Sequence, residues 1–251
     1  MGKKKVVTTT TTVVTTTTTD EPVKACRILF VLDRSGSMQS IREEAIGGFN
    51  RFLSEQKALP GECTFSLMLF DDKIEDPYID RPIADIPPLD TNTFVPRAMT
   101  ALYDAVGRMV TRYEMTNVPG TKTILVILTD GEENASREYN KSTVSSKIKR
   151  VEDEYGWETL FLGSGFNVDA VANNLNIKSG NRMKFDANMI GQTQQSYAVA
   201  SASASAYRGF APVRSMNVDL ADTNAVNNML AESQKAIDET VAKMKKDPAA
   251  T

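Results

Sequence analysis

Short apolar segments alternate along the chain with longer segments whose apolar residues recur at helical spacing. Five apolar segments are typical of buried strands in a sheet: residues 26–32, 64–70, 123–128, 158–162 and 182–185. Four segments with apolar residues three and four apart are predicted to be helices: residues 39–58, 100–113, 142–155 and 168–175. A short edge strand is expected at 76–79. Because right-handed crossovers place helices on both faces, the pattern predicts an α/β fold with a doubly wound, mostly parallel sheet.

The pattern changes after residue 187. Residues 192–207 are rich in Gln, Ala and Ser, and the high helix propensity of alanine favours a helix there. The segment 222–246 is predicted to be a helix with one apolar stripe, formed by Val226, Leu230, Ile237, Val241 and Met244. Two interpretations of this stripe remain open: it packs on the parent domain, or it docks with a partner or another copy of the chain.

The first 22 residues are mostly threonine with two valine pairs. Without large apolar side chains they cannot build a core, so a mobile arm is expected. Their β-branched composition also fits addition to a sheet edge or stacking in an assembly, and the hydroxyls are candidate phosphate acceptors. The predicted organisation is an arm at 1–22, an α/β domain at 23–187 and a helical C-terminal extension at 188–251.

Composition and charge exclude several classes of function. The chain has 251 residues and a formal net charge of −3, which argues against a nucleic-acid partner bound through a generally basic surface. It has no histidine, which excludes Ser-His-Asp and Cys-His catalysis and His-ligated zinc sites. No apolar run reaches membrane-spanning length, so no membrane partner is expected. Cys26 and Cys63 are expected to be free thiols near the amino ends of neighbouring strands, in a cytoplasmic protein.

Polar side chains follow two of the predicted buried strands. Asp33, Ser35 and Ser37 leave the first strand, and Asp130 leaves the strand at 123–128. In doubly wound sheets, ligands bind at the carboxyl ends of strands, and these two strands are expected to be neighbours. The two carboxylates then face one pocket and need a cation. Hydroxyl and carboxylate oxygens suit Mg²⁺ or Mn²⁺, and Ca²⁺, which needs more ligands, is less favoured.

These motifs resemble the metal-ion-dependent adhesion site of the von Willebrand factor A (VWA) domain family. The family pattern Asp-x-Ser-x-Ser, a threonine and an Asp-Gly turn matches Asp33-Arg-Ser-Gly-Ser37, Thr100 and Asp130-Gly131, and the resemblance covers about residues 25–186. Thr100 is preferred over Thr91 and Thr93 because it opens a helix, as the family's threonines do.

The resemblance implies a ligand set and a type of partner. Ser35, Ser37 and Thr100 are expected to touch the ion, Asp33 and Asp130 to act directly or through water, and an Asp or Glu of a partner to complete the shell. The usual glycine near the threonine is absent, because Ala98-Met99 stands there.

The main hypothesis is therefore a non-enzymatic module that binds an acidic residue of a partner protein through Mg²⁺, with Arg34 or Arg97 contacting the surrounding surface. The alternative is an assembly protein that forms homo-oligomers or filaments through the arm and the C-terminal helix. Metal-assisted hydrolysis is a distant third, because the cluster lacks a base or nucleophile.

Two acidic pairs near the predicted site are assigned smaller roles. Glu132 and Glu133 are expected to be solvated. Asp71 and Asp72, which follow the second strand, are secondary candidates for the face that holds the metal.

Overall fold

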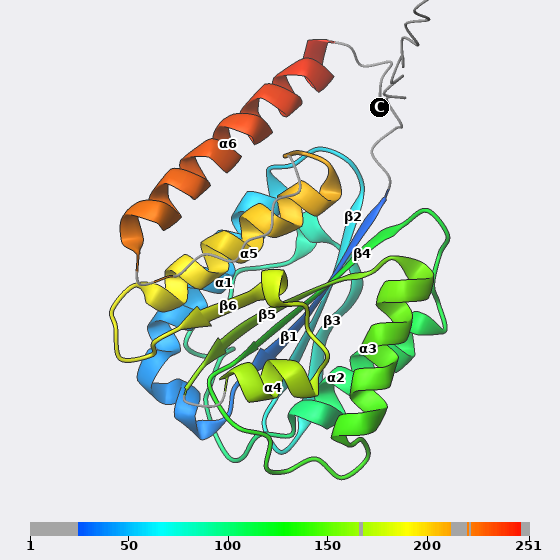
Figure 1. Ribbon diagram of the computed structural model, residues 1–251, viewed down its shortest axis with the longest axis vertical. Coiled ribbons are helices and arrows are strands. Elements are labelled where there is room, and N and C mark those ends of the chain that lie inside the picture. Colours follow the sequence, from blue (N-terminus) through cyan, green and yellow to red (C-terminus); the bar gives the residue numbers. More distant parts are fainter. Residues whose placement is uncertain (1–24, 166–167, 212–219, 221, 247–251) are drawn as a thin grey trace, which may run out of the picture.

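A six-stranded sheet forms the centre of the molecule (Figure 1). The computed structural model describes residues 25–165, 168–211, 220 and 222–246, so the Thr-rich arm at 1–22 lies outside the described residues. The strands are β1 (Cys26–Asp33), β2 (Cys63–Phe70), β3 (Ile74–Pro82), β4 (Lys122–Thr129), β5 (Glu158–Ser164) and β6 (Arg182–Phe185). Their order is β3-β2-β1-β4-β5-β6, and β3 alone is antiparallel to its neighbour. The predicted edge strand is present and longer than expected.

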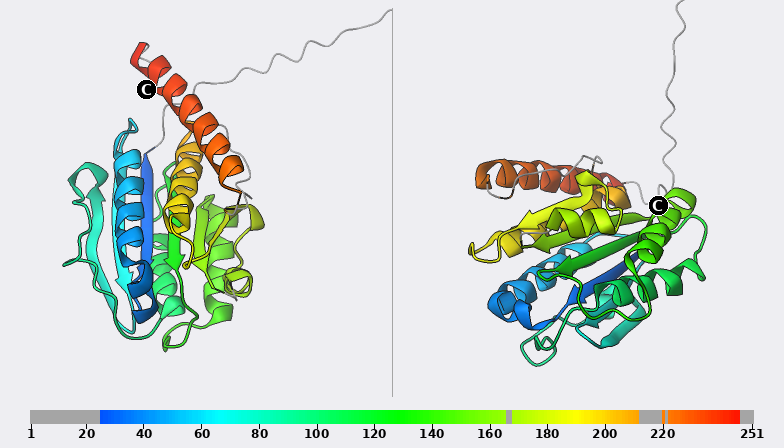
Figure 2. Two further views of the ribbon diagram at one scale, coloured as in Figure 1. Left: turned by 90° about the vertical axis from the view of Figure 1, so that its left-hand side faces the viewer. Right: turned by 60° about the horizontal axis from the view of Figure 1, so that its bottom comes forward.

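Helices cover both faces of this sheet, which confirms the predicted fold class. They are α1 (Arg42–Lys57), α2 (Leu102–Glu114), α3 (Lys141–Tyr155), α4 (Val168–Asn174), α5 (Gln192–Arg208) and α6 (Thr223–Lys246). Helices α1 and α5 lie on one face, and α2, α3 and α4 lie on the other (Figure 2). Because β1 and β4 are adjacent at the centre, the loops that follow them leave the sheet side by side.

Alternation along β1 divides the core into two layers. Phe30 packs on the first face, with its ring centroid 5.2 Å from that of Phe49 on α1 and 6.1 Å from that of Tyr197 on α5. Leu29 and Val31 point into the other layer, toward α2 and α3. The apolar core thus continues beyond residue 187 into α5, while the division of the chain at that residue stays a prediction.

The close packing of α1 on α5 depends on Gly48. A Cβ at Gly48 would lie 2.2 Å from a ring carbon of Tyr197, whose side chain is fully buried and has no room to move. Gly48→Ala is therefore expected to lower the free energy of unfolding by about 1–3 kcal/mol through overpacking, although alanine favours helix. Urea denaturation measures this loss. Gly47→Ala is the matched control, because its Cβ would meet only the flexible Gln194 side chain at 3.4 Å, and equal stabilities would contradict the packing described.

The two cysteines lie as the sequence predicts. Cys26 and Cys63 are directly paired in the register of β1 and β2, at the end of the sheet opposite the predicted metal site. Both are buried and free of disulfide bonds.

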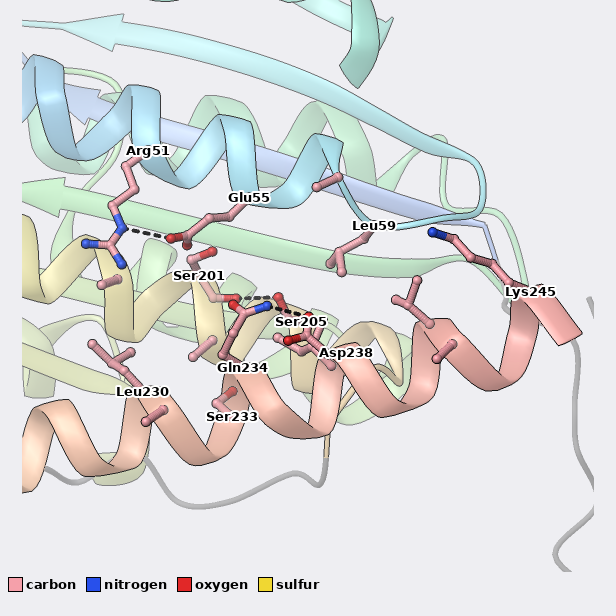
Figure 3. Close-up of a pocket in the computed structure, with 17 residues that line it drawn as sticks. Arg51, Glu55, Leu59, Ser201, Ser205, Leu230, Ser233, Gln234, Asp238 and Lys245 are labelled. Carbon is pink, nitrogen blue, oxygen red and sulfur yellow. Dashed lines mark hydrogen bonds and ion pairs between the residues drawn. The ribbon is translucent and has the colours of Figure 1, made fainter.

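Helix α6 crosses the outer side of α5 (Figure 2). Val226 is fully buried, and the rest of the predicted stripe, including Leu230 and Ile237, is half-buried. A cavity of about 580 Å³ separates the middle of α6 from α1 and α5 (Figure 3). The stripe thus packs on its own domain, as the first interpretation expected, but incompletely. Even this helix, the longest described, falls short of the length and apolarity needed to cross a bilayer, as do the other described helices.

Candidate metal centre

Asp33, the last residue of β1, is a buried carboxylate fixed by its neighbours. Its Oδ1 accepts a hydrogen bond of 2.7 Å from the backbone amide of Ser35, and its Oδ2 accepts one from the Thr129 hydroxyl on β4. Burial raises the pKa of Asp33 to about 7, and the hydrogen bonds from Thr129 and Ser35 oppose this shift. A carboxylate whose charge is costly in the protein interior is strongly stabilised by a cation beside it.

The two serines and Asp130 join this carboxylate from two loops. The Oγ atoms of Ser35 and Ser37 are 3.1 Å apart, and the Ser37 hydroxyl donates a 2.7 Å hydrogen bond to Oδ1 of Asp130. Burial raises the pKa of Asp130 as well. The loops after β1 and β4 therefore bring their predicted ligands together.

Thr100 completes the cluster from a third loop, just before α2. A Cβ placed at Gly131 would lie 3.1 Å from Oγ1 of Thr100, 3.5 Å from Oγ of Ser37 and 3.7 Å from Oγ of Ser35. The three hydroxyls thus surround one point. Thr93 instead bonds within its own turn, where its hydroxyl contacts Asp90, so Thr100 is the threonine that the fold brings to the cluster.

The donor set fits a small, hard divalent cation. It consists of two carboxylates and three hydroxyls, all oxygen, which is the chemistry that Mg²⁺ and Mn²⁺ prefer. In the part of the chain that the structure describes, no three Asp, Glu or Cys side chains gather around one point, so any ion here depends on the hydroxyls. The hydroxyls are neutral, so an ion that they ligate directly, with the carboxylates acting through water, stays attractive to an outside carboxylate.

The segment before α2 is bonded to the Asp-x-Ser-x-Ser loop through backbone atoms. The Arg97 amide donates to the Arg34 carbonyl at 2.8 Å, and the Gly36 amide donates to the Ala98 carbonyl at 3.1 Å. Ala98 takes a φ of 57°, in the left-handed region that glycine enters without strain. Alanine therefore holds the conformation for which the family's usual glycine would be better suited.

Arg34 takes a different role from the one the sequence suggested, whereas the side chain of Arg97 is 46% exposed and still reaches the surface. The Arg34 guanidinium is only 4% exposed and donates to Asp71 at 2.9 Å and to Glu75 at 2.8 Å. Arg97 donates to the same two carboxylates, at 2.9 and 2.6 Å. Hydrogen bonds from Arg34, then Arg97, lower the pKa of Glu75 to about 2. The prediction that Arg34 contacts a partner is wrong, because its charge is buried and paired; the network ties the loops together.

Asp71 also belongs to this network rather than to the metal cluster. Its Oδ2 accepts from both arginines, and its Oδ1 accepts from the Lys73 amide at 2.7 Å. Asp71 lies on the predicted side of the sheet, but both of its carboxylate oxygens already accept hydrogen bonds within the protein.

Glu133 is a structural residue that sequence reasoning missed. Its carboxylate accepts hydrogen bonds from the amides of Tyr103 at 2.8 Å, Ala135 at 3.0 Å and Ser136 at 2.7 Å. The expectation that it is solvated is therefore wrong. Helix α2 begins after Ala101, which has no capping side chain, so Glu133 supplies the acceptor and the negative charge that a helix N-terminus favours.

Comparison with known proteins identifies the fold and no more. No protein-family model and no curated protein sequence matches the chain. Among solved structures, proximal thread matrix protein 1 from the mussel byssus is 15% identical, with a TM-score of 0.52 over 73% of this chain and 47% of that protein. The ArnB paralog VWA2 from Sulfolobus acidocaldarius is 17% identical, with a TM-score of 0.51 over 73% of this chain and 46% of that one.

Two of the similar structures contain a bound metal ion. The manganese-loaded TRAP protein of Plasmodium vivax is 13% identical, with a TM-score of 0.51 over 67% of this chain and 71% of that chain. The mussel protein was also solved with zinc in its metal-ion-dependent adhesion site. This chain spans about half the length of the first two matched proteins. It has the VWA fold, which confirms the resemblance seen in its motifs.

Proposed function

We propose that this chain is a protein-interaction module that captures an Asp or Glu side chain of a partner through a bound divalent ion. One observation carries the proposal: oxygen donors from three loops converge at the carboxyl ends of β1 and β4. Ser35, Ser37 and Thr100 serve as direct ligands. Asp33 and Asp130 act directly or through water, and the partner's carboxylate takes the remaining position.

Mg²⁺ is the proposed ion, with Mn²⁺ as a substitute. Both accept a small set of oxygen ligands in octahedral geometry and keep waters that a carboxylate can displace. Ca²⁺ is less favoured because it takes about six to eight oxygens. Because the three proposed direct ligands are neutral hydroxyls, the bound ion keeps its positive charge toward an outside carboxylate.

Under this proposal the chain is a binding module and not an enzyme. Two carboxylates near the cluster are engaged elsewhere: Asp71 with two arginines and Glu133 with backbone amides. A cytoplasmic location is proposed with it, on the strength of the two free thiols.

Nuclear magnetic resonance of the full chain tests the proposal with a minimal ligand. Mg²⁺ is expected to shift the amide signals of Ser35 and Gly131, and acetate is expected to shift them further only when Mg²⁺ is present. Acetamide, a neutral molecule of the same shape, is the control. A response to acetate in EDTA, or an equal response to acetamide, would contradict capture of a carboxylate by a metal.

The half-buried stripe of α6 supports assembly as a second candidate function. Ile237 and Val241 line the cavity beside α1 and α5, and another copy could cover them. We nevertheless expect a monomer of 27.6 kDa, because α6 already packs on α5. Light scattering during size-exclusion chromatography measures the mass. A multiple of this mass that falls to the monomer value in Ile237→Glu would instead favour assembly.

A further inference from the structure

Two thiols lie side by side at the end of the sheet opposite the metal cluster. Cys26 begins β1 and Cys63 begins β2, and the two are direct partners in the parallel register. Neighbouring strands are about 4.8 Å apart, which is within the Cα separation of about 4.4–6.8 Å that a disulfide spans. Both side chains belong to the core layer beneath α1 and α5, so they point to the same side of the sheet, and their thiols hydrogen-bond each other. The strand pairing thus brings the two sulfurs within reach of one covalent bond.

The pair lies one residue below the protein surface. Ala25 and Glu62, which precede the two cysteines, are both exposed. The Cys26 amide donates to the Glu62 carbonyl at 2.9 Å, so the two strand ends are fixed to each other. The cysteines keep a small exposed fraction, 4% for Cys26 and 7% for Cys63. Such access suits a reagent as small as hydrogen peroxide.

A buried cation beside the thiols lacks a counter-charge. Arg208, the last residue of α5, is only 3% exposed. Within the described part of the chain, its guanidinium donates to neutral oxygens alone: the carbonyl of Gln56 at 2.9 Å, Oε1 of Gln56 at 3.1 Å and the carbonyl of Pro60 at 3.4 Å. Its Nε has no hydrogen-bond partner among these residues. Because an uncompensated buried charge is costly, the site favours a negative charge near Arg208.

A thiolate at Cys63 supplies that charge. The hydrogen bond from Cys26 lowers the pKa of Cys63, burial opposes this shift, and the charge of Arg208 lowers the pKa further. The hydrogen bond to Cys63 and burial raise the pKa of Cys26. The pair therefore shares one proton, which stays on Cys26. A thiolate beside a fixed cation and a donor group is typical of reactive cysteines.

We propose that Cys26 and Cys63 form a redox pair that hydrogen peroxide oxidises to a reversible disulfide, with Cys63 as the attacking sulfur and Cys26 as the resolving one. Three observations carry the inference: the direct register of the two cysteines, the bond between their thiols and the buried charge of Arg208. The site is separate from the metal cluster and independent of the proposed function. In a reducing compartment such a disulfide is transient and senses oxidants.

The oxidation proceeds in two steps. The Cys63 thiolate attacks one oxygen of the peroxide; an S–O bond forms, the O–O bond breaks, and the departing hydroxide takes a proton from solvent to become water. The sulfur of Cys26 then attacks the sulfenic acid; the S–S bond forms, the S–O bond breaks, and the departing hydroxide takes the thiol proton of Cys26. The two sulfurs together lose two electrons, which reduce one peroxide to two waters.

Counting thiols in the full chain tests the redox pair. The protein, free of metal and reductant, is treated with hydrogen peroxide, and catalase stops the reaction. The remaining thiols are labelled with a maleimide in urea and counted by intact mass. We expect two labels before treatment, none after it and two again after reduction with dithiothreitol, all at the mass of a single chain. Oxidation of methionine by peroxide does not change this count.

Single-cysteine variants separate the two roles. In Cys26→Ser, which keeps a hydroxyl donor beside Cys63, we expect peroxide to form a sulfenic acid that dimedone traps. In Cys63→Ser, the remaining Cys26 is expected to react on the order of tenfold more slowly, because burial keeps it protonated. Equal rates in the two variants would overturn the assignment of Cys63 as the attacking sulfur.

The variants Arg208→Gln and Arg208→Lys are a matched pair that tests the role of the buried charge. Both lose the hydrogen bonds of the guanidinium, and only the lysine variant keeps a positive charge. We expect peroxide to oxidise the pair about tenfold more slowly in Arg208→Gln and within about threefold of the wild-type rate in Arg208→Lys. Equal slowing in both would show that Arg208 acts through packing, which contradicts a thiolate stabilised by its charge.

Other results would overturn the redox pair itself, and the thiol count reveals each of them. They are thiols in the folded chain that resist a peroxide concentration that oxidises glutathione, loss of only one label, and a loss that dithiothreitol does not reverse. A disulfide-linked dimer would equally contradict a bond within one chain.

Discussion

Asp33→Asn is expected to abolish the stabilisation of this protein by Mg²⁺ and, with it, the binding of carboxylate ligands. The substitution keeps the size and polarity of the side chain and removes one negative charge next to the ion. A unit charge about 4 Å from another contributes several kcal/mol at the dielectric typical of proteins, so we expect the affinity for Mg²⁺ to fall at least about 100-fold. Thermal denaturation with and without Mg²⁺ measures the effect.

In the metal-free protein, Asp33→Asn is expected to maintain or raise the thermal stability. Because burial raises the pKa of Asp33 to about 7, above its value near 4 in an unfolded chain, the ionised form is disfavoured in the folded state. The metal-free wild type therefore loses stability as the pH rises from about 4 to about 7, and Asp33→Asn lacks this loss. In EDTA at pH 8 the variant is expected to melt at or above the wild-type temperature.

Asp85→Asn, which changes an exposed carboxylate away from the cluster, is the matched control and should leave the response to Mg²⁺ intact. An Asp33→Asn protein that melts well below the wild type in EDTA would show that Asp33 stabilises the fold. The Asp33 carboxylate would then be stable in the folded protein without a cation beside it, which would contradict the account.

Gly131→Val is expected to exclude the ion without unfolding the protein. A Cβ at this position lies 3.1 Å from Oγ1 of Thr100 and within 3.7 Å of both serine hydroxyls, so the two further methyl groups of valine would fill the space between the donors. The backbone of Gly131 is outside the left-handed region, so a side chain is not strained there. We expect the affinity for Mg²⁺ to fall at least about 100-fold, with Gly131→Ala intermediate.

Calorimetric titration of Mg²⁺ into each variant measures the series, and denaturation in EDTA shows that the fold persists. Gly47→Ala on α1, whose Cβ would meet only the Gln194 side chain at 3.4 Å, is the control. Unchanged Mg²⁺ binding in Gly131→Val would mean that the hydroxyls do not converge on the ion.

The order of strands and helices was predictable because each buried strand has a nearly continuous apolar segment. Residues 26–32 and 123–128 are examples, and adjacency of β1 and β4 followed from the topology of doubly wound sheets. The alanine content of residues 192–207 favoured a helix, but the sequence did not show where this helix packs. Its fixed position comes from long-range packing of Tyr197 on Phe30 and Gly48, which local pattern does not contain.

The predicted ligands were found together because the motif and the topology restrict them strongly. The roles of the residues around the ligands were not predictable, because no motif restricts them and their partners are distant in the sequence. Arg34 is buried by carboxylates 37 and 41 positions away, and Glu133 caps a helix about 30 positions before it. A charged residue in a loop is most often solvated, so only the fold reveals that these charges are paired.

The most direct test of the central claim is a crystal structure of the full chain grown with Mn²⁺ and measured at the manganese absorption edge. We predict one anomalous peak about 2.0–2.3 Å from the hydroxyl oxygens of Ser35 and Ser37, with a water or a carboxylate from outside the domain among its ligands. A crystal with Mn²⁺ bound elsewhere, and none among Ser35, Ser37 and Thr100, would contradict the account.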